Sequence, residues 1–124
     1  MIKLKSLLKE ASTPSGYDRA MKKMLSYMKG IAEKSAKKHN PKTYDNESWE
    51  YPALLKKGSK FDKVVAVRAS DPKKARSADF FVHRETGDIY KSASWSAPAK
   101  GARGNIFDSK TWKKYDVFGG WLYR

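Results

Sequence analysis

The sequence of 124 residues contains no cysteine, and histidine is limited to His39 and His83. The missing thiols exclude disulfide bonds, thiolate catalysis and cysteine-based zinc sites. Two histidines far apart in the chain are poor evidence for a metal site. No apolar run approaches the ~18 residues that span a bilayer, and the lysines of MIKLKSLLKE interrupt any signal-peptide core. We therefore expect no membrane span, no disulfide, no metal and no cofactor.

Motifs for catalysis and nucleotide binding are also missing. The segment KGARGN (Lys100–Asn105) has two glycines but lacks the G-x-x-x-x-G-K-[ST] order of a phosphate-binding loop. His83 with Asp79 or Asp88 could form an acid–base pair, but nothing in the sequence places a substrate beside them. We therefore expect a protein that is not an enzyme and has no catalytic residue.

Positive charge is abundant. The chain has 27 Lys and Arg against 13 Asp and Glu, which gives a net charge of +14. Such a protein is attracted to polyanions, so nucleic acid or an acidic protein is the expected partner. Bulk solubility is the other explanation for the lysines. The candidate nucleic-acid-binding residues are Lys73, Lys74, Arg76, Lys91, Lys100, Arg103, Lys113 and Lys114.

A helical repeat dominates the first third of the chain. Apolar and small side chains recur at steps of three and four, which predicts an amphipathic helix over residues 17–39 that ends at Asn40-Pro41. The members of this stripe are Tyr17, Met21, Met24, Met28, Ile31 and Ser35. We interpret it as the core-facing side of the helix, with a partner-binding groove as the alternative. Residues 1–16 are expected to form a docking arm or a short helix.

Strand patterns follow in residues 61–124, which we expect to hold the sheet. FDKVVAVR, ADFFVH and DIYKSAS predict three strands, the last two joined as a hairpin through Gly87. Residues 43–52 are interpreted as an acidic, aromatic connector, residues 71–77 as a basic loop, and the tail as a short helix with a last strand. One long helix beside a small antiparallel sheet predicts a single α+β domain over residues 1–124.

Aromatic residues alternate with basic ones in two segments, around Trp95 and around Trp112. Single-strand binders use such rings as stacking platforms, but rings in a chain of this length usually belong to the core. We expect Trp95 to be buried among small neighbours, Pro98 to turn the chain, and Lys100 and Arg103 to point into solvent.

The segment TGDIYKSASWSAPAKGARGNIFD (Thr86–Asp108) resembles small uncharacterised proteins of tailed bacteriophages. These share G-D-x-Y-K-x-A-S-W-x-A-P-A-K followed by A-R-G-N-[IV]-[FY]. The resemblance implies a viral origin and a setting in the host cytoplasm or the virion. It implies no activity and supplies no catalytic residue.

Charge and resemblance together predict a small basic phage-type protein that binds nucleic acid or another polyanion non-specifically. The alternative is a minor virion structural protein or a module that docks on a host protein. The methionine stripe, the aromatic segment Tyr44–Tyr51 and the aromatic end Trp121–Tyr123 would serve that alternative. The sequence leaves the oligomeric state open.

Overall fold

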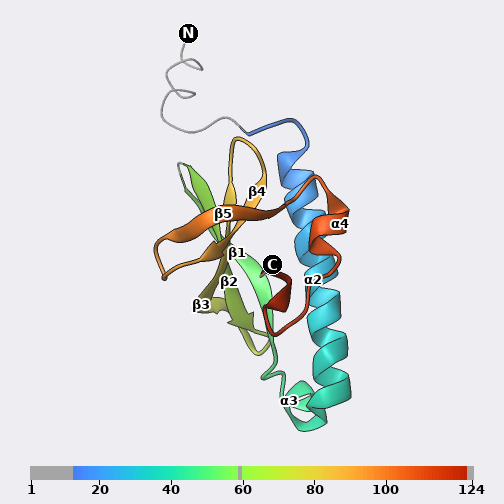
Figure 1. The fold of residues 1–124 in the computed structure, drawn as a ribbon. Helices are drawn as coiled ribbons and strands as arrows, with labels where there is room; N and C mark the ends of the chain where they lie inside the picture. The colour runs from blue at the N-terminus through green and yellow to red at the C-terminus, as the bar shows by residue number, and fades with distance from the viewer. Residues whose placement is uncertain (1–12, 59, 123–124) are drawn as a thin grey trace.

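The computed structural model describes residues 13–58 and 60–122, and one long helix lies beside one sheet (Figure 1). The five strands form an antiparallel meander in the order β1-β2-β3-β4-β5. This arrangement confirms the predicted α+β class. The elements are α2 (Tyr17–His39), α3 (Pro41–Asp45), β1 (Glu50–Lys57), β2 (Phe61–Arg68), β3 (Asp71–His83), β4 (Asp88–Ser92), β5 (Pro98–Asn105), α4 (Ser109–Trp112) and the 3-10 turn η1 (Gly120–Leu122).

Helix α2 has the predicted bounds, and its methionine stripe faces the core. The buried residues of the helix are Tyr17, Met21, Met24, Met28, Ala32 and Ala36. Ile31 and Ser35 are only half-buried. In the last two turns the buried face of the helix shifts by one residue, so that Ala32 and Ala36 are buried instead. The stripe is therefore a packing surface, and the interpretation as a free partner-binding groove is wrong.

The core lies between α2, one face of the sheet and the C-terminal segment (Figure 1). Phe80 of β3 contacts Trp121 edge to face at 5.3 Å, and Tyr27 of α2 contacts Trp112 at 5.5 Å. Trp121 is 5% exposed. It therefore cannot serve as the docking surface that the aromatic C-terminus suggested.

The sheet is larger than the sequence predicted. It begins at Glu50, within the expected connector, and β3 includes the expected basic loop 71–77. Both halves of β3 pair with β2. Only Phe80, Phe81 and Val82, in the second half of β3, also pair with β4, so the exposed first half of β3 has β2 as its one neighbouring strand within the described residues. Polar side chains are tolerated there because they project into solvent.

The expected last strand is not present within residues 106–122, where the chain forms α4 and η1 instead. Residues 1–12 of the expected docking arm lie outside the described residues. Within the described ranges, no helix combines the length and apolar character needed to cross a membrane.

Rings of the aromatic segment Tyr44–Tyr51 pack against one another rather than standing free. Trp49 lies 6.4 Å from Tyr44 and 5.5 Å from Tyr51 between ring centroids. Lysines of α2 cover both ends, with Lys37 Nζ 5.3 Å from the Tyr44 ring and Lys29 Nζ 4.6 Å from the Tyr51 ring. These contacts tie the start of β1 to α2.

Candidate functional site: the outer face of the sheet

Successive side chains of β2 point to opposite faces of the sheet. Asp62 and Val64 are buried on the side that faces α2, so Phe61 and Lys63 project from the opposite side. The pairing of β2 with β3 places Phe61 opposite His83 and Lys63 opposite Phe81. We call the side of the sheet that faces away from α2 the outer face.

Phe61 is the centre of an aromatic cluster on the outer face. Its ring centroid lies 6.3 Å from Phe81, 5.1 Å from His83 and 5.6 Å from Tyr90. All three contacts are close to perpendicular, the edge-to-face geometry that aromatic quadrupoles favour. The cluster is only partly buried, since Phe61, His83 and Tyr90 all retain contact with solvent.

Two lysines border these rings. Lys63 Nζ lies 4.0 Å from the centroid of Trp95 and 5.8 Å from that of Phe81, and Lys60 Nζ lies 5.7 Å from that of Phe61. At such distances an ammonium is attracted by the π face of a ring. Between them is a hollow of about 260 Å³. It is lined by Leu55, Gly58, Lys60, Phe61, Lys63, Phe81, Ser96 and Pro98.

Trp95 is 50% exposed, so the prediction of a buried core tryptophan is wrong. It lies in the turn between β4 and β5, and its small neighbours at positions 93–97 are exposed as well. They therefore make no room for a crossing backbone segment. Pro98 does not turn the chain but begins β5, where its missing N–H costs little.

The glycine-containing segment KGARGN lies within strand β5 rather than in a loop. Gly101 has a φ of 88°, and a Cβ on Gly104 would lie 3.0 Å from the Thr111 hydroxyl of α4. A close approach by a second segment therefore does occur, at Gly104 rather than around Trp95. Lys100 is exposed as predicted, whereas Arg103 is half-buried and its Nε is enclosed by protein.

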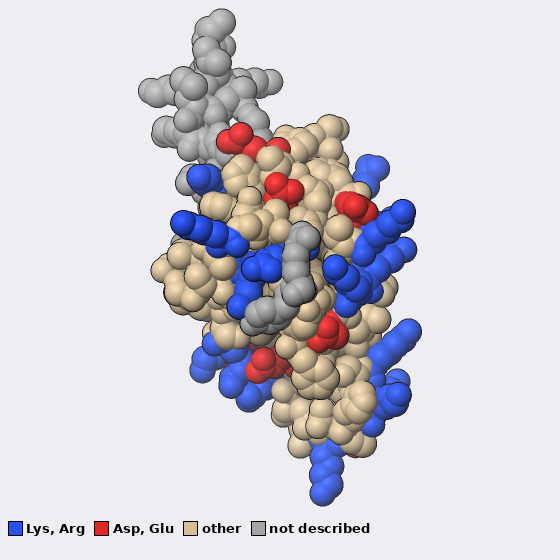
Figure 2. All heavy atoms as spheres, in the orientation of Figure 1, with Lys and Arg blue, Asp and Glu red and all other residues tan. Residues whose placement is uncertain are grey.

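The eight candidate basic residues are dispersed over the molecule. Lys73 and Lys74 are exposed on the first half of β3, where Arg76 pairs with Glu50 at 2.8 Å. Lys91 of β4 is half-buried opposite Phe80. In Figure 2 basic side chains occupy both margins of the visible face, including the right-hand one beside α2. Charge alone therefore does not select a site.

Lys113 and Lys114 follow α4, on the α2 side of the sheet (Figure 1). The Tyr27 hydroxyl of α2 donates a hydrogen bond to the Lys113 carbonyl at 2.9 Å, and Trp112 beside them belongs to the core. These two lysines therefore face a different part of the surface from Lys60 and Lys63. Sequence reasoning missed Lys60 and Lys63, although the alternation Phe61-Asp62-Lys63-Val64 is visible in the strand.

Within residues 13–58 and 60–122, His83 forms no acid–base pair with Asp79, which lies on the other side of the sheet. His83 lies on the outer face and its Nδ1 accepts a hydrogen bond from the Glu85 backbone N–H at 3.3 Å. Asp79 lines a pocket with Tyr115 and Trp121 on the opposite side of the sheet. Burial, reinforced by the charge of Glu50, raises the pKa of Asp79 to about 6. In the described part of the chain no three His, Asp or Glu residues cluster as metal ligands.

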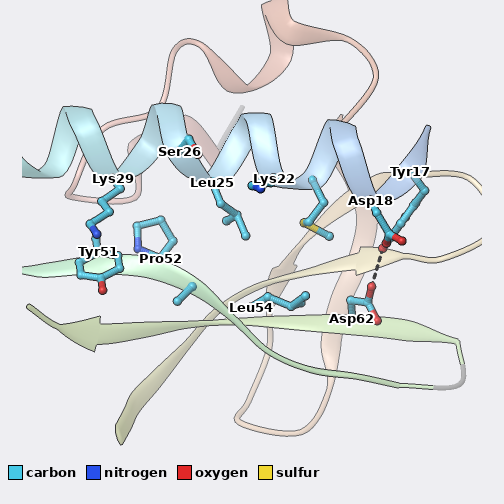
Figure 3. Close-up of a pocket in the computed structure, with 12 residues that line it drawn as sticks. Tyr17, Asp18, Lys22, Leu25, Ser26, Lys29, Tyr51, Pro52, Leu54 and Asp62 are labelled. Carbon is cyan, nitrogen blue, oxygen red and sulfur yellow. Dashed lines mark hydrogen bonds between the residues drawn. The ribbon is translucent and has the colours of Figure 1, made fainter. Parts of the chain in front are cut away.

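A second concave feature is a groove of about 440 Å³ between α2 and the edge strand β1 (Figure 3). Met21 and Leu25 project into it from the helix, and Pro52 and Leu54 from the strand side. Lys22 and Lys29 belong to its lining from α2, as does Asp18 near Tyr17. The groove is thus apolar at its base and mostly basic along the helix.

A buried polar network closes one end of this groove. The Asp62 carboxylate is 0% exposed and accepts hydrogen bonds from Arg84 Nη1 at 2.8 and 3.1 Å and from the Tyr17 hydroxyl at 2.9 Å. Burial and the hydrogen bond to Asp62 raise the pKa of Tyr17 well above its ordinary value. The phenol therefore stays protonated and donates a hydrogen bond to the carboxylate, which makes this end a structural clamp between α2 and β2.

These features define a small, strongly basic α+β domain in which a helix covers one face of an antiparallel meander and leaves the other face open. The chain belongs to a family of unknown function (DUF7717), whose pattern matches residues 10–124. Neither the curated proteins nor the solved structures include a match to this chain.

Proposed function

We propose that the protein binds nucleic acid without reading its base sequence, and that the outer face of the sheet is the binding surface. The observation that supports this most is the lining of the outer hollow, which among the described residues includes Lys60 and Lys63 but no carboxylate. In a chain of net charge +14 such a surface attracts phosphates strongly. Base-reading motifs are missing from the sequence, so the contacts are expected to be mainly with the backbone.

A salt titration tests the proposal. Anisotropy of a labelled oligonucleotide is measured between about 50 and 200 mM salt, where the affinity for duplex DNA should fall with a log–log slope of about −0.9 per neutralised phosphate. The double variant Lys60→Ala/Lys63→Ala should weaken binding and flatten the slope by up to about two phosphate contacts.

The matched control is Lys113→Ala/Lys114→Ala, which removes the same charge from the α2 side. Both variants lower the net charge equally, so a difference between them reports on the surface and not on the total charge. Equal weakening by the two double variants would contradict the outer face as the binding surface. No retention of DNA or RNA at low salt would contradict nucleic-acid binding altogether.

The resemblance of Thr86–Asp108 to tailed-phage proteins supports a viral setting for this activity. We place the protein in the infected host cytoplasm or in the virion. Mass spectrometry of purified particles distinguishes the two, because a virion component remains with the particles through purification.

A second candidate function is docking on an acidic protein partner, which the groove between α2 and β1 favours. Its base is apolar, and Lys22 and Lys29 lie along the helix side (Figure 3). An amphipathic helix with acidic flanks would match both features. Replacing Leu25 by Glu should abolish recovery of such a partner from nuclease-treated lysate and leave nucleic-acid binding unchanged. Recovery of the same partner by the variant would rule out the groove.

A further inference from the structure

We infer that the outer face takes single-stranded nucleic acid, with a base stacked on Trp95 and the adjoining phosphates held by Lys60 and Lys63. This inference rests on the proposed function and narrows it to one substrate class. It depends on the rings of the outer face, whereas the general proposal depends on the charge.

Exposed aromatic rings on the protein surface favour a single-stranded ligand over a duplex. A duplex hides the faces of its bases in the stack and offers a protein chiefly phosphates and groove edges. A single strand exposes base faces, which stack on aromatic side chains regardless of sequence. A surface built only for duplex phosphates would have no use for half-exposed rings.

Trp95 has the exposure and the surroundings that stacking requires. Half of its surface is in solvent, although the chain buries Trp112 and Trp121 to 2% and 5% exposure. The residues at 93, 94, 96 and 97 are alanines and serines, whose side chains are too small to cover the indole from within the same turn. Burying this ring against a base would remove a large apolar surface from water.

Lys63 supplies the charge at the same place. Its Nζ lies over one face of the Trp95 ring, 4.0 Å from the centroid. A base would stack on the opposite face of the indole, where its own phosphate can still approach this ammonium. Lys60 Nζ lies 5.7 Å from the Phe61 ring centroid, and both residues line the same hollow as Lys63. Rings and cations therefore alternate across the outer face, the combination found in grooves for single strands.

Phe118 is an exposed ring without this arrangement, at 86% exposure. Phe118 follows Asp116, whose carboxylate accepts a hydrogen bond from the Phe118 backbone N–H at 2.9 Å. A phosphate beside Phe118 would meet that negative charge. Phe118 is therefore a control for exposure without the basic surroundings.

The experiment measures binding of an oligothymidylate, an oligouridylate and a duplex of equal length to the intact chain at one low salt concentration. Trp95→Ala should weaken binding of both single strands roughly 5- to 100-fold, the loss expected from one stacked base, and change duplex binding less than about twofold. Phe118→Ala should leave all three affinities unchanged. The two single strands also show whether the surface discriminates DNA from RNA.

Tryptophan fluorescence provides a second readout that a merely structural role would not produce. Stacking a base on Trp95 should quench the emission of the wild type upon addition of oligothymidylate. Trp95→Phe keeps a stacking ring, so it should bind within a few-fold of the wild type. It should lose most of the quenching, since Trp112 and Trp121 are buried and Trp49 is half-buried between the rings of Tyr44 and Tyr51.

The outcomes separate the inference from the proposal on which it rests. If single strands and duplex bind equally and Trp95→Ala changes neither, the stacking inference is wrong but nucleic-acid binding stands. If none of the three ligands binds at low salt, both fail. Preserved quenching in Trp95→Phe would likewise overturn the assignment of the stacking ring.

Discussion

Two ion pairs in this protein have the same length and very different surroundings, which makes them a test of what burial does to a charge. Arg84 Nη1 and Arg76 Nε each lie 2.8 Å from a carboxylate oxygen, of Asp62 and Glu50 respectively. The side chains of the first pair are 7% and 0% exposed, and those of the second are 37% and 42% exposed. We consider replacing each arginine by methionine, which keeps most of the length and removes the charge.

The expected cost follows from what remains around each carboxylate. Without Arg84, Asp62 keeps two neutral donors, the Tyr17 hydroxyl and the Gly58 backbone N–H, for a charge that water cannot reach. Breaking a buried pair in this way costs about 3–5 kcal/mol. Without Arg76, Glu50 is solvated, so the loss should be about 0–1 kcal/mol. Against a total stability of roughly 5–15 kcal/mol for a domain, only the first loss is severe.

Urea unfolding and a thermal melt of both variants measure the difference. Arg84→Met should lower the melting temperature by roughly 4 °C for each kcal/mol lost, whereas Arg76→Met should melt close to the wild type. Replacing Asp62 by leucine in the Arg84→Met background should recover much of the loss, because no buried charge is then left unpaired. Similar small losses in the two single variants would refute the reasoning, since the Asp62 site would then admit water.

Four further predictions concern stability. Because burial raises the pKa of Asp79 to about 6, the folded state gains stability by protonation as the pH falls through that value. Asp79→Asn should therefore stabilise the protein by up to about 3 kcal/mol near pH 7 and have no effect near pH 4, as urea unfolding at the two pH values would show. Gly30→Ala should stabilise α2 by about 0.5–1 kcal/mol, since a methyl group there meets no atom within 4 Å. Gly104→Ala should destabilise the protein, because its Cβ would lie 3.0 Å from Thr111, and a thermal melt of both glycine variants gives the comparison. Trp95→Ala should cost no more than about 1 kcal/mol, well below the ~3–5 kcal/mol of a core tryptophan, because half of this ring is already in water.

Local patterns were sufficient for the elements that carry a strong repeat. The stripe from Tyr17 to Met28 predicted helix α2 and its buried side, because a helix of this length has one face to bury. The valine-rich strand β2 and the turn at Gly87, with a φ of 79°, were predicted for equally local reasons. A run of valines and a glycine between two strand patterns are features that can be identified in the sequence directly.

Pairing partners explain what local patterns missed. Residues 71–77 have low strand propensity, yet they extend β3 because they pair with β2. Residues 98–105 contain Gly101 and Gly104 and were not among the predicted strands, yet they form β5 beside β4. Hydrogen bonds to a neighbouring strand stabilise both segments, and a single-segment pattern carries no record of that neighbour.

For the candidate site too, some properties follow from the sequence alone and others only from the tertiary structure. Composition alone determined that the chain is basic enough to attract polyanions and has no thiol chemistry, because charge and atom types need no fold to be counted. Which cations lie together was decided only by the tertiary structure, which brings Lys60 and Lys63 into one hollow, places Lys63 beside Trp95 and leaves Lys113 on the α2 side. The position of Trp95 was decided in the same way, since α2 and the C-terminal segment cover only one face of the sheet. A ring on the covered face, such as Phe80, becomes core, whereas on the outer face Phe81 is buried at 4% exposure and Trp95, in the turn, stays half exposed.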